Sequence, residues 1–429
     1  MAAGVRFERL EDWLDWQQRL HPATIELGLE RVSRVLGRTG WRPPRVPVIT
    51  VGGTNGKGSC VALLDAMLRA GGWRVGTFTS PHLLDYRERI RIDGSKASAA
   101  SLVAAFERIT DALGPDTLTF FEFNTLAALL VFETAGPDAL VLEVGLGGRL
   151  DAVNLVDPTV AVIVSVGLDH MDWLGPDVES IGREKAGIFR PGSPAVFGTP
   201  QPPASIRARA REIAAPLLVR GTDFDGCAAD AGCWNYLVEG RVERASLPVP
   251  ALPGPVQVAN AATALAALDA LSDRLPLSRA AIDAGLRSVR LAGRFQRVSD
   301  PRGFEWILDV AHNPAAAATL ADNLRALPVT GRTLAVCGML GDKDVTGVIA
   351  ALRDSIDEWL AASSEGPRAI DAAELVRRAL SAGVTLQPAG TVPEAMNRAA
   401  SLARPGDRVV VFGSFHTVGP ALASLGVHL

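Results

Sequence analysis

Residues 48–59 read Val-Ile-Thr-Val-Gly-Gly-Thr-Asn-Gly-Lys-Gly-Ser. The first four are apolar or β-branched, which is typical of a short buried strand. Four of the next seven residues are glycine, and glycine lets the backbone approach a ligand closely. From Cys60 onward apolar residues recur at helical spacing. A strand, a glycine loop with a lysine and a helix form the arrangement that cradles phosphate groups, because the loop N–H groups and Lys57 supply positive charge.

The loop departs from the usual Walker pattern at one position. In that pattern a Ser or Thr directly follows the lysine and binds Mg²⁺. Here Gly58 follows Lys57, and Ser59 comes one place later. Either Ser59 adapts or another hydroxyl holds the metal. Our candidate is Ser80, since residues 73–79 predict a second strand and ligands bind at the carboxyl ends of parallel strands; a plain Ser-Pro turn is the alternative.

Composition narrows the class of protein. The chain has 429 residues, 48% hydrophobic and 21% charged, which is ordinary for a soluble globular protein of two or three domains. A formal net charge of −4 argues against a broad nucleic-acid surface. The four cysteines make no disulfide framework, and we interpret them as reduced thiols of a cytoplasmic protein. Early acidic residues argue against a signal peptide, and no apolar run reaches membrane-spanning length.

Two further predicted strands, at 139–144 and 159–166, end in residues that can bind a metal. Glu143 interrupts the first apolar run, where a carboxylate is costly unless it is paired or metal-bound. An acidic residue that ends a strand downstream of a phosphate loop is the usual position of an Mg²⁺-organising carboxylate. His170 follows the second strand. Alone it would more often be a satisfied core histidine, but beside Glu143 it becomes a candidate metal ligand or phosphate contact.

Other stretches give plainer expectations. Residues 24–36 predict a helix, and a close approach would explain Gly28 inside it. The aromatic run 120–123 is either core or a wall for a flat heterocycle. Residues 195–255 carry short strands, glycines and prolines, which predict an antiparallel addition. Lys185, on a mixed-charge helical turn, reads by itself as a solvated surface lysine.

After residue 296 the pattern restarts. Strands are predicted at 306–310, 334–337 and 408–412, and polar residues again cluster at their ends. Length and periodicity therefore predict a second α/β domain over 297–429, after a first domain over 1–296.

Eight motifs taken from these stretches occur in the order found in one enzyme family. They are Gly53–Ser59, Thr79–His82, Glu143–Asp151, Leu168–His170, Glu184–Gly187, Gly293–Gln296, Asp309–Pro314 and Gly413–His416. From about residue 10 to residue 420 the chain resembles the folylpolyglutamate synthases, and among them the bacterial bifunctional dihydrofolate synthases/folylpolyglutamate synthases. The resemblance implies an ATP-binding central domain with a mostly parallel sheet, joined to a smaller Rossmann-like domain as in the Mur ligases.

The resemblance also implies ligands for ATP and metal. The ATP-binding residues would be Thr54, Asn55, Gly56, Lys57, Gly58, Ser59, Asn260, Arg294 and Asp309. Arg294 and Asp309 would reach ATP from either side of the domain boundary. Ser80, Glu143 and His170 would organise Mg²⁺, which agrees with the independent interpretation of Ser80 and Glu143. Lys185 occupies a position that is carbamylated in the family, and the carbamate would hold a second Mg²⁺ ion.

The same resemblance places the substrates. The dihydropteroate pocket would be formed by Glu26, Leu27, Gly28, Leu29, Thr119, Phe120, Phe121, Glu122, Leu150 and Asp151. Lys57, Lys185 and His312 are implied as catalytic residues, and Ser414 and His416 as substrate contacts. One departure is Val153, where relatives usually have Thr before Asn154; it puts a hydroxyl contact of that loop in doubt.

The implied chemistry fits these residue types. A carboxylate is a poor acylating agent, so ATP converts it to an acyl phosphate, which the amine of L-glutamate then attacks with loss of phosphate. The protein would mainly position the groups and neutralise charge. The implied substrates are 7,8-dihydropteroate, reduced folates and L-glutamate. We expect a monomer that binds neither nucleic acid nor membrane.

Three alternatives stay open. A Mur-type ligase would act on another carboxylate, but those enzymes carry a whole substrate domain before the phosphate loop, and only about 50 residues precede it here. A monofunctional folylpolyglutamate synthase would lack dihydrofolate synthesis. A non-catalytic phosphate-loop switch would not need the second α/β domain.

Overall fold

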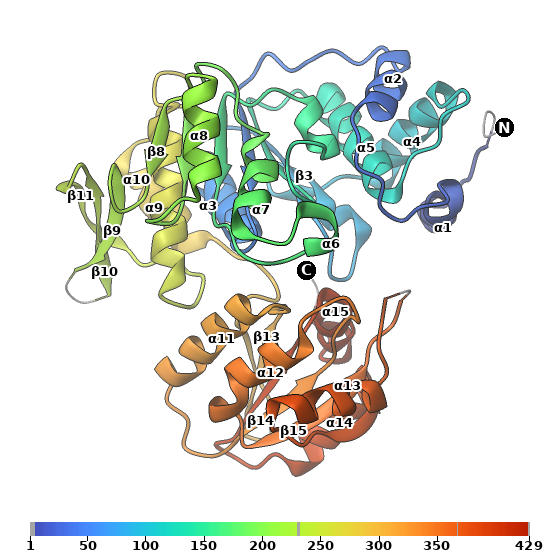
Figure 1. The fold of residues 1–429 in the computed structure, drawn as a ribbon, viewed down its shortest axis with the longest axis vertical. Helices are drawn as coiled ribbons and strands as arrows, with labels where there is room; N and C mark the ends of the chain where they lie inside the picture. Colours follow the sequence, from blue (N-terminus) through green and yellow to red (C-terminus); the bar gives the residue numbers. More distant parts are fainter. Residues whose placement is uncertain (1–4, 230–231, 367, 428–429) are drawn as a thin grey trace. The chain divides into compact units, whose positions relative to one another are not determined.

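A computed structural model describes residues 5–229, 232–366 and 368–427 (Figure 1). The chain forms two compact units. The first consists of the chain up to Ser80 with Arg87–Ala251 and Val258–Val289. The second consists of Pro81–Tyr86, Leu252–Gln257 and the chain from Arg290 onward. Each unit is built on its own sheet, and each is described by itself.

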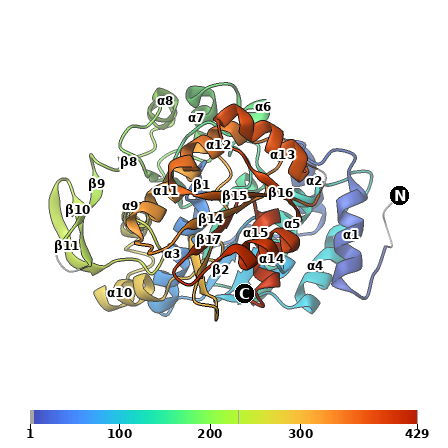
Figure 2. The same ribbon diagram turned by 90° about the horizontal axis from the view of Figure 1, so that it is seen from below.

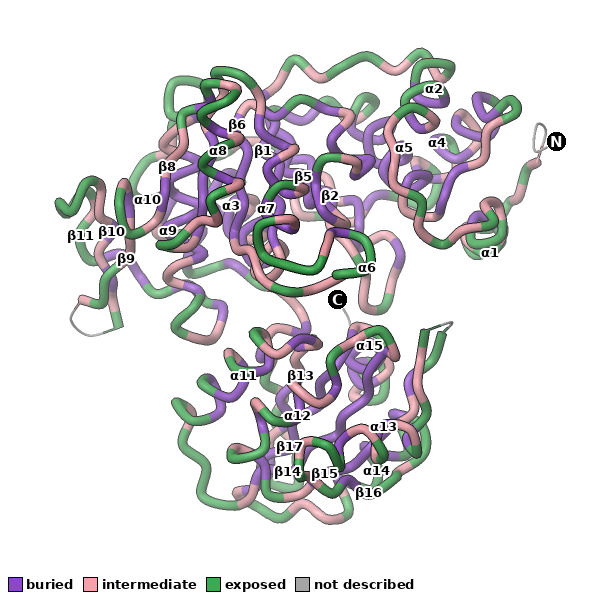
Figure 3. The backbone as a smooth tube through the Cα atoms, in the orientation of Figure 1, coloured by how far each residue is buried: buried purple, intermediate pink, exposed green. Residues whose placement is uncertain are grey.

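In the described part of the chain, an eight-stranded sheet organises the first unit, in the order β4-β3-β2-β5-β1-β6-β7-β8. The strands are β1 (Val48–Gly52), β2 (Val75–Phe78), β3 (Ile90–Ile92), β4 (Ser95–Lys96), β5 (Ala139–Glu143), β6 (Val160–Ile163), β7 (Ala195–Phe197) and β8 (Leu217–Val219). From β2 to β8 neighbouring strands are parallel, whereas β3 and β4 pair antiparallel. Every residue of β1 and β5 is buried, as expected for a parallel sheet covered on both faces (Figure 3).

The helices of this unit cover both faces of the sheet (Figure 1). α3 packs on β1, β2 and β5, and α5 packs on β2 with α4 beside it. The bounds are α1 (Leu10–Leu20), α2 (Glu30–Arg38), α3 (Lys57–Ala70), α4 (Ala99–Ala112), α5 (Phe120–Ala135), α6 (Met171–Leu174), α7 (Val178–Ala186), α8 (Ala204–Glu212), α9 (Val256–Asp269) and α10 (Arg279–Ser288), with 3₁₀ helices η1 (Tyr86–Arg89) and η2 (Ala152–Leu155). None of the described helices combines the length and apolar character that a membrane crossing requires.

The register of the central strands brings their carboxyl ends to one edge. Val51 of β1 pairs with Glu143 of β5, and Gly52 pairs with Ile163 of β6. Phe78 of β2 pairs with Leu142 of β5. The phosphate loop after β1, Ser80 after β2 and the loops after β5 and β6 therefore leave the sheet side by side.

Two expectations for this unit are wrong. Residues 24–29 are not helical, since α2 begins at Glu30. Glu26 instead hydrogen-bonds His21 and ion-pairs with Arg31, contacts that favour an irregular segment. A Cβ on Gly28 would meet no protein atom within 4 Å, so packing inside the protein does not explain this glycine.

The region 195–255 is antiparallel only in part. β7 and β8 extend the parallel sheet, with α8 between them. The antiparallel sheet is limited to β9 (Phe224–Ala228), β10 (Cys233–Val238) and β11 (Arg241–Pro248). The alanine- and arginine-rich stretch 204–212 favours a helix, and the sequence interpretation overlooked it.

The second unit is a six-stranded α/β sheet in the described chain, in the order β12-β13-β17-β14-β15-β16. Its elements are β12 (Gln296–Ser299), β13 (Glu305–Asp309), α11 (Pro314–Ala326), β14 (Thr333–Cys337), α12 (Val345–Leu352), η3 (Arg353–Ser355), β15 (Glu358–Ser363), α13 (Ala372–Ala379), η4 (Leu380–Ala382), β16 (Gln387–Thr391), α14 (Val392–Leu402), β17 (Arg408–Phe412) and α15 (Phe415–Ser424). β13, β17, β14, β15 and β16 are parallel, and β12 pairs antiparallel at one edge.

The sheet of the second unit separates two hydrophobic cores. Ala335 and Cys337 of β14 face the core under α11, α12 and α13. Leu334 and Val336 face the core under α14 and α15. Figure 2 shows α11, α12 and α13 on one side of this sheet and α14 and α15 on the other. Helices on both faces of a mostly parallel sheet confirm the predicted α/β class with a Rossmann-like second part. The predicted boundary at 296/297 lies close to Arg290.

Candidate active site

The phosphate loop has the backbone that a close-fitting cradle requires. β1 ends at Gly52 and α3 begins at Lys57, so residues 53–56 form the turn. Gly53 and Gly56 have φ of 148° and 85°, in the region that favours glycine. A Cβ on Gly56 would lie 2.8 Å from Val164 Cγ1, so space also demands glycine there. The sequence prediction of strand, glycine turn and helix is confirmed in form.

Ser165, just beyond β6, holds this loop in place. Its carbonyl accepts a hydrogen bond from the Thr54 amide at 2.8 Å, and its hydroxyl donates to Asn55 O at 2.9 Å. The Asn55 amide in turn donates to that hydroxyl at 3.0 Å. The Thr54 hydroxyl also bonds the Gly167 backbone. The sequence interpretation missed Ser165, although a polar residue at the end of a buried strand was a usable signal.

Lys57 and Asn260 both lie at the loop. The Lys57 ammonium donates to Gly53 O at 3.0 Å and to Thr54 O at 3.2 Å, so its charge sits above the turn. Asn260 comes from α9, about 200 residues later, and its Oδ1 lies 3.1 Å from where a Gly56 Cβ would be. Gly58 and Ser59 lie in the first turn of α3, where free N–H groups and the helix dipole favour an anion.

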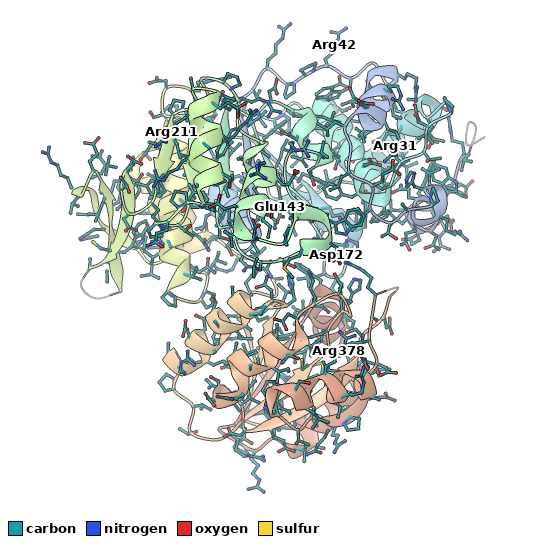
Figure 4. The ribbon with its side chains drawn as sticks, viewed as in Figure 1. Arg31, Arg42, Glu143, Asp172, Arg211 and Arg378 are labelled. Atoms are coloured by element: carbon teal, nitrogen blue, oxygen red, sulfur yellow. The ribbon has the colours of Figure 1, made fainter. Side chains whose placement is uncertain are left out.

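Ser80 and Glu143 are neighbours. The Ser80 amide donates to Glu143 Oε2 at 3.1 Å, and Glu143 is only 5% exposed. Figure 4 labels Glu143 within the first unit. In the described chain no group of three or more His, Cys, Asp or Glu side chains could hold a metal ion. Mg²⁺ nevertheless suits such a place, because it usually takes one or two protein oxygens and keeps phosphate and water oxygens. The donor set present therefore fits Mg²⁺ bound together with a nucleotide.

His170 has an unusual backbone for a residue other than glycine. Its φ is 53°, at the N-cap of α6, and its amide donates to Asp169 Oδ1 at 2.9 Å. Non-glycine residues in this region are uncommon and cluster at functional sites. Its side chain is half-buried, with Nε2 3.9 Å from Asp169 Oδ1.

Lys185 is buried, so its interpretation as a solvated surface lysine is wrong. It lies in the last turn of α7 and is 4% exposed. Burial, aided by the nearby Lys57 charge, lowers the pKa of Lys185 to about 7, although Asp169 and Asp151 act in the opposite direction. The charged residues around it in sequence pointed to solvent, but the turn is covered by the loop after β5.

That covering contact is tight. The Arg149 amide donates to Glu184 O at 2.8 Å, and Asn154 Nδ2 donates to both Arg149 O and Gly187 O. A Cβ on Gly148 would lie 2.9 Å from Lys185 O. The glycines of this loop thus let its backbone rest directly on the turn that carries Lys185.

Asp151 closes the same loop. Its carboxylate accepts hydrogen bonds from the amides of Leu146, at 2.8 Å, and Val153, at 3.0 Å. Burial raises the pKa of Asp151 to about 6, against the lowering effect of these bonds. The departure at Val153 leaves this backbone contact intact. Leu150 precedes Asp151 and is half-buried.

The run 119–123 divides between core and surface. Phe123 is fully buried and belongs to the core, whereas Phe120 and Phe121 are half-buried. The Arg89 guanidinium lies over the Phe120 ring, 5.4 Å from its centre. Phe121 packs against Phe78, with ring centres 5.9 Å apart. The two half-buried rings are the ones the resemblance assigned to the substrate.

Polar groups connect residues 26–29 and 119–122, the two segments that the resemblance assigned to dihydropteroate. Thr119 is the N-cap of α5, and Glu122 completes a capping box by accepting its amide at 2.8 Å. Glu122 also binds Arg31, which in turn binds Glu26. Leu27, Gly28 and Leu29 are half-buried beside these contacts in sequence.

The second unit holds the remaining predicted residues. Asp309 ends β13 and accepts hydrogen bonds from the amides of Phe295 and Ala311, both at 2.8 Å. Burial raises the pKa of Asp309, which Arg294 partly offsets. The Arg294 guanidinium lies over the Phe415 ring. Arg294 and Asp309 belong to the same unit, unlike the expected placement on either side of a boundary, because this unit begins before Arg294.

His312, Ser414 and His416 follow the carboxyl ends of neighbouring strands. β13 and β17 are adjacent and parallel, so His312 and Ser414 leave the sheet at the same edge. His312 Nδ1 lies 2.9 Å from Val310 O, and Ser414 Oγ lies 2.8 Å from Thr417 Oγ1. Burial lowers the pKa of the His416 imidazole, and Arg368 adds to the effect. An exposed edge with such groups is where ligands bind in open α/β sheets.

Comparison with known proteins identifies the family. Residues 51–197 match the Mur ligase middle domain, and residues 293–415 match the Mur ligase glutamate ligase domain. The dihydrofolate synthase/folylpolyglutamate synthase of Escherichia coli is 47% identical over 95% of this chain and 94% of its own. The chain belongs to the dihydrofolate synthase/folylpolyglutamate synthase family. The Mycobacterium tuberculosis member is 33% identical over 90% of this chain and 83% of its own.

Solved structures of this family have the same fold. Escherichia coli FolC in complex with DHPP and ADP superposes with a TM-score of 0.91, at 45% identity over 97% of both chains. A bifunctional folylpolyglutamate synthase/dihydrofolate synthase with Mn, AMPPNP and L-glutamate bound has a TM-score of 0.89, at 46% identity over 97% of this chain and 98% of that one. The likeness therefore covers both units and holds at high identity.

Proposed function

We propose that the protein is an ATP-dependent ligase that joins L-glutamate to the carboxylate of 7,8-dihydropteroate, giving dihydrofolate, ADP and phosphate. The observation that carries the proposal is the phosphate loop of β1 and α3, with Ser80 and Glu143 bonded together beside it. Relatives of high identity bind ADP or AMPPNP, a divalent metal, DHPP and L-glutamate. A non-catalytic switch has no use for these acid and amine substrates.

The chain's own groups suit the first step, phosphoryl transfer. Loop amides and the α3 N-terminus would bind the phosphates, and Lys57 would neutralise charge on the transferred group. Glu143 and the Ser80 hydroxyl would hold Mg²⁺, which when bound would neutralise phosphate charge. The substrate carboxylate then attacks the terminal phosphorus, and ADP leaves. This requires positioning and exclusion of water more than acid–base chemistry.

The second step joins the amine. The α-amine of L-glutamate attacks the acyl phosphate carbonyl, a tetrahedral intermediate forms, and phosphate leaves with the bonding electrons. The attacking amine must lose a proton, and His312 or His416 is placed among the polar strand ends where such a group would act. Ser414, on the same edge, would help orient the amino acid.

Finer points of the proposal concern Lys185 and the range of substrates. A carbamate on Lys185, with Glu143 and His170, would hold a second Mg²⁺ ion. Its burial beside the loop 145–151 supports this, because a buried ammonium is costly there. Reduced folates would be extended by the same chemistry at a γ-carboxylate. We also propose that residues 1–296 bind ATP and residues 297–429 bind glutamate, in a cytoplasmic monomer.

Product analysis tests the proposal. Purified protein with ATP, Mg²⁺ and L-glutamate should form dihydrofolate from dihydropteroate and longer polyglutamates from tetrahydrofolate. Phosphate release should require both the pterin acid and glutamate. Extension of tetrahydrofolate without any dihydrofolate synthesis would leave only a monofunctional folylpolyglutamate synthase. ATP hydrolysis at a rate that depends on neither the pterin acid nor L-glutamate would overturn the ligase assignment.

A further inference from the structure

A network of charged side chains joins segment 21–29 to the start of α5. Arg31 Nη2 donates to both carboxylate oxygens of Glu122, at 2.7 and 2.9 Å. Its other terminal nitrogen, Nη1, donates to Glu26. His21 bridges from the other end, with Nε2 2.8 Å from Glu26 and Nδ1 2.7 Å from Thr117 Oγ1. Arg31 therefore connects two stretches that are about 90 residues apart in sequence.

Both carboxylates that the resemblance assigned to the dihydropteroate pocket, Glu26 and Glu122, form ion pairs within this network. Glu122 accepts the Thr119 amide and binds Arg31, and it is almost completely buried. Glu26 lies between His21 and Arg31. The Glu26 side chain is 49% exposed, whereas Glu122, engaged in this way and buried, has little capacity left to bind a pterin ring. Its role is better explained as fixing the backbone on which neighbouring pocket residues lie.

Arg31 is costly to place here for stability alone. Its side chain is 16% exposed, and its Nε is buried without a hydrogen-bond partner in the described chain. Buried unsatisfied polar atoms are few in native proteins, and each calls for an explanation. Buried ion pairs also stabilise little against apolar substitutes, although they can fix one arrangement among several. Figure 4 shows Arg31 where α2 meets α5.

We propose that Arg31 is a positioning residue for the pterin substrate. It holds residues 26–29 against the N-terminus of α5, so that the two segments form one preorganised pocket wall before the substrate arrives. The proposal rests on the proposed function, since it assigns the pterin acid to these segments. We expect the loss of Arg31 to weaken the binding of the pterin acid alone. The proposed ATP site is the phosphate loop, and the proposed L-glutamate site lies in the second unit.

Arg34 provides a matched control on the same helix. Its Nη2 lies 2.7 Å from Asp116 Oδ1, an ion pair from α2 to the chain before α5 in which the arginine is more exposed than Arg31. Asp116 is outside both pocket segments. Arg31→Lys keeps the charge but cannot reproduce the forked contact to Glu122. Glu122→Gln keeps an acceptor for the α5 cap and removes the charge. Arg34→Lys makes the same chemical change away from the pocket.

The test combines steady-state kinetics with hydrogen exchange. Arg31→Lys and Glu122→Gln should each raise the KM for dihydropteroate about tenfold, the scale of one lost charged hydrogen bond. Their KM values for ATP and L-glutamate should stay within about twofold, and the amides of residues 23–29 should exchange faster. The double variant should be no worse than the poorer single variant, because both act through one contact. Arg34→Lys should change none of these quantities.

Each outcome is decisive. An unchanged KM for dihydropteroate in an active Arg31→Lys enzyme, or equal rises of all three KM values, would overturn the proposal. Unchanged exchange of the amides of residues 23–29 would overturn it too. If Arg31→Lys fails to fold, Glu122→Gln carries the same test. A wild-type enzyme that makes no dihydrofolate would instead refute the proposed function.

Discussion

Gly148 offers a sharp test of the contact that covers Lys185. It lies in the loop after β5, and its φ is outside the region that requires glycine, so only space is at issue. A Cβ there would lie 2.9 Å from Glu184 O, 2.9 Å from Lys185 O and 3.0 Å from Ile188 Cγ2. Two of these atoms are backbone oxygens of one helical turn, which cannot rotate away. Gly148→Ala must therefore push the loop and the turn of Lys185 apart.

The size of the effect follows from those distances. A methyl group with two backbone contacts below 3.0 Å is overpacked, which typically costs about 1–3 kcal/mol. For a unit of this size, about 2 kcal/mol lowers Tm by roughly 4–8 °C. The same displacement moves Lys185, and misplacement by about 1 Å can cost up to about 10²-fold in rate. We expect kcat to fall about 10- to 100-fold.

Gly37→Ala is the matched control. Gly37 lies in α2, and a Cβ there would meet nothing within 4 Å. Alanine should stabilise this helix by about 1 kcal/mol, raising Tm by about 2–4 °C with unchanged kcat. Differential scanning calorimetry and initial rates measure both variants. If the Gly148→Ala variant has the same Tm and kcat as the wild type, the loop does not rest on the turn that carries Lys185.

The remaining predictions concern phosphate and metal. Lys57→Ala should lower kcat at least about 10²-fold without changing Tm, and near-normal turnover would show that the loop does not cradle phosphate. Ser80→Ala should raise the Mg²⁺ concentration for half-maximal rate more than Ser59→Ala does; the reverse order would assign the metal to Ser59. Lys185→Ala should be nearly inactive and partly rescued by short carboxylic acids, whereas wild type should lose activity on CO₂ removal and regain it with bicarbonate. An unmodified amine in the electron density of an active, ATP-bound crystal would exclude the carbamate.

The spacing of apolar residues and the placement of glycines predicted those helices and strands that depend mainly on neighbouring residues in the sequence. The strand and helix around Lys57 follow from apolar spacing and glycine placement, and the structure has them within a few residues. The proximity of Ser80 and Glu143 was also predictable. Glu143 ends β5 and Ser80 follows the end of β2, and adjacent parallel strands bring their carboxyl ends to one edge.

Contacts between distant segments could not be predicted in this way. The helix expected from residue 24 starts instead at Glu30, because Glu26 is held by His21 and Arg31. Lys185 has charged neighbours typical of a surface turn, but a loop about 35 residues earlier buries it. In both cases tertiary contacts override local propensity, and a single sequence contains no record of them. Only the resemblance to the family pointed to Lys185.

The metal site illustrates why the chain's own ligands can be so few. In the proposed site Glu143 and Ser80 would offer Mg²⁺ one carboxylate and one hydroxyl, and the described chain has no group of three or more His, Cys, Asp or Glu side chains that could hold a metal ion. The remaining oxygens would come from water and from the nucleotide phosphates. The bound nucleotide would then supply part of the metal site, and the bound metal part of the nucleotide site. By linkage, each ligand would raise the protein's affinity for the other by the same factor. A protein that supplied a full set of metal ligands would bind Mg²⁺ without ATP and lose this coupling. The sparse site thus suits an enzyme whose substrate is the nucleotide–metal complex.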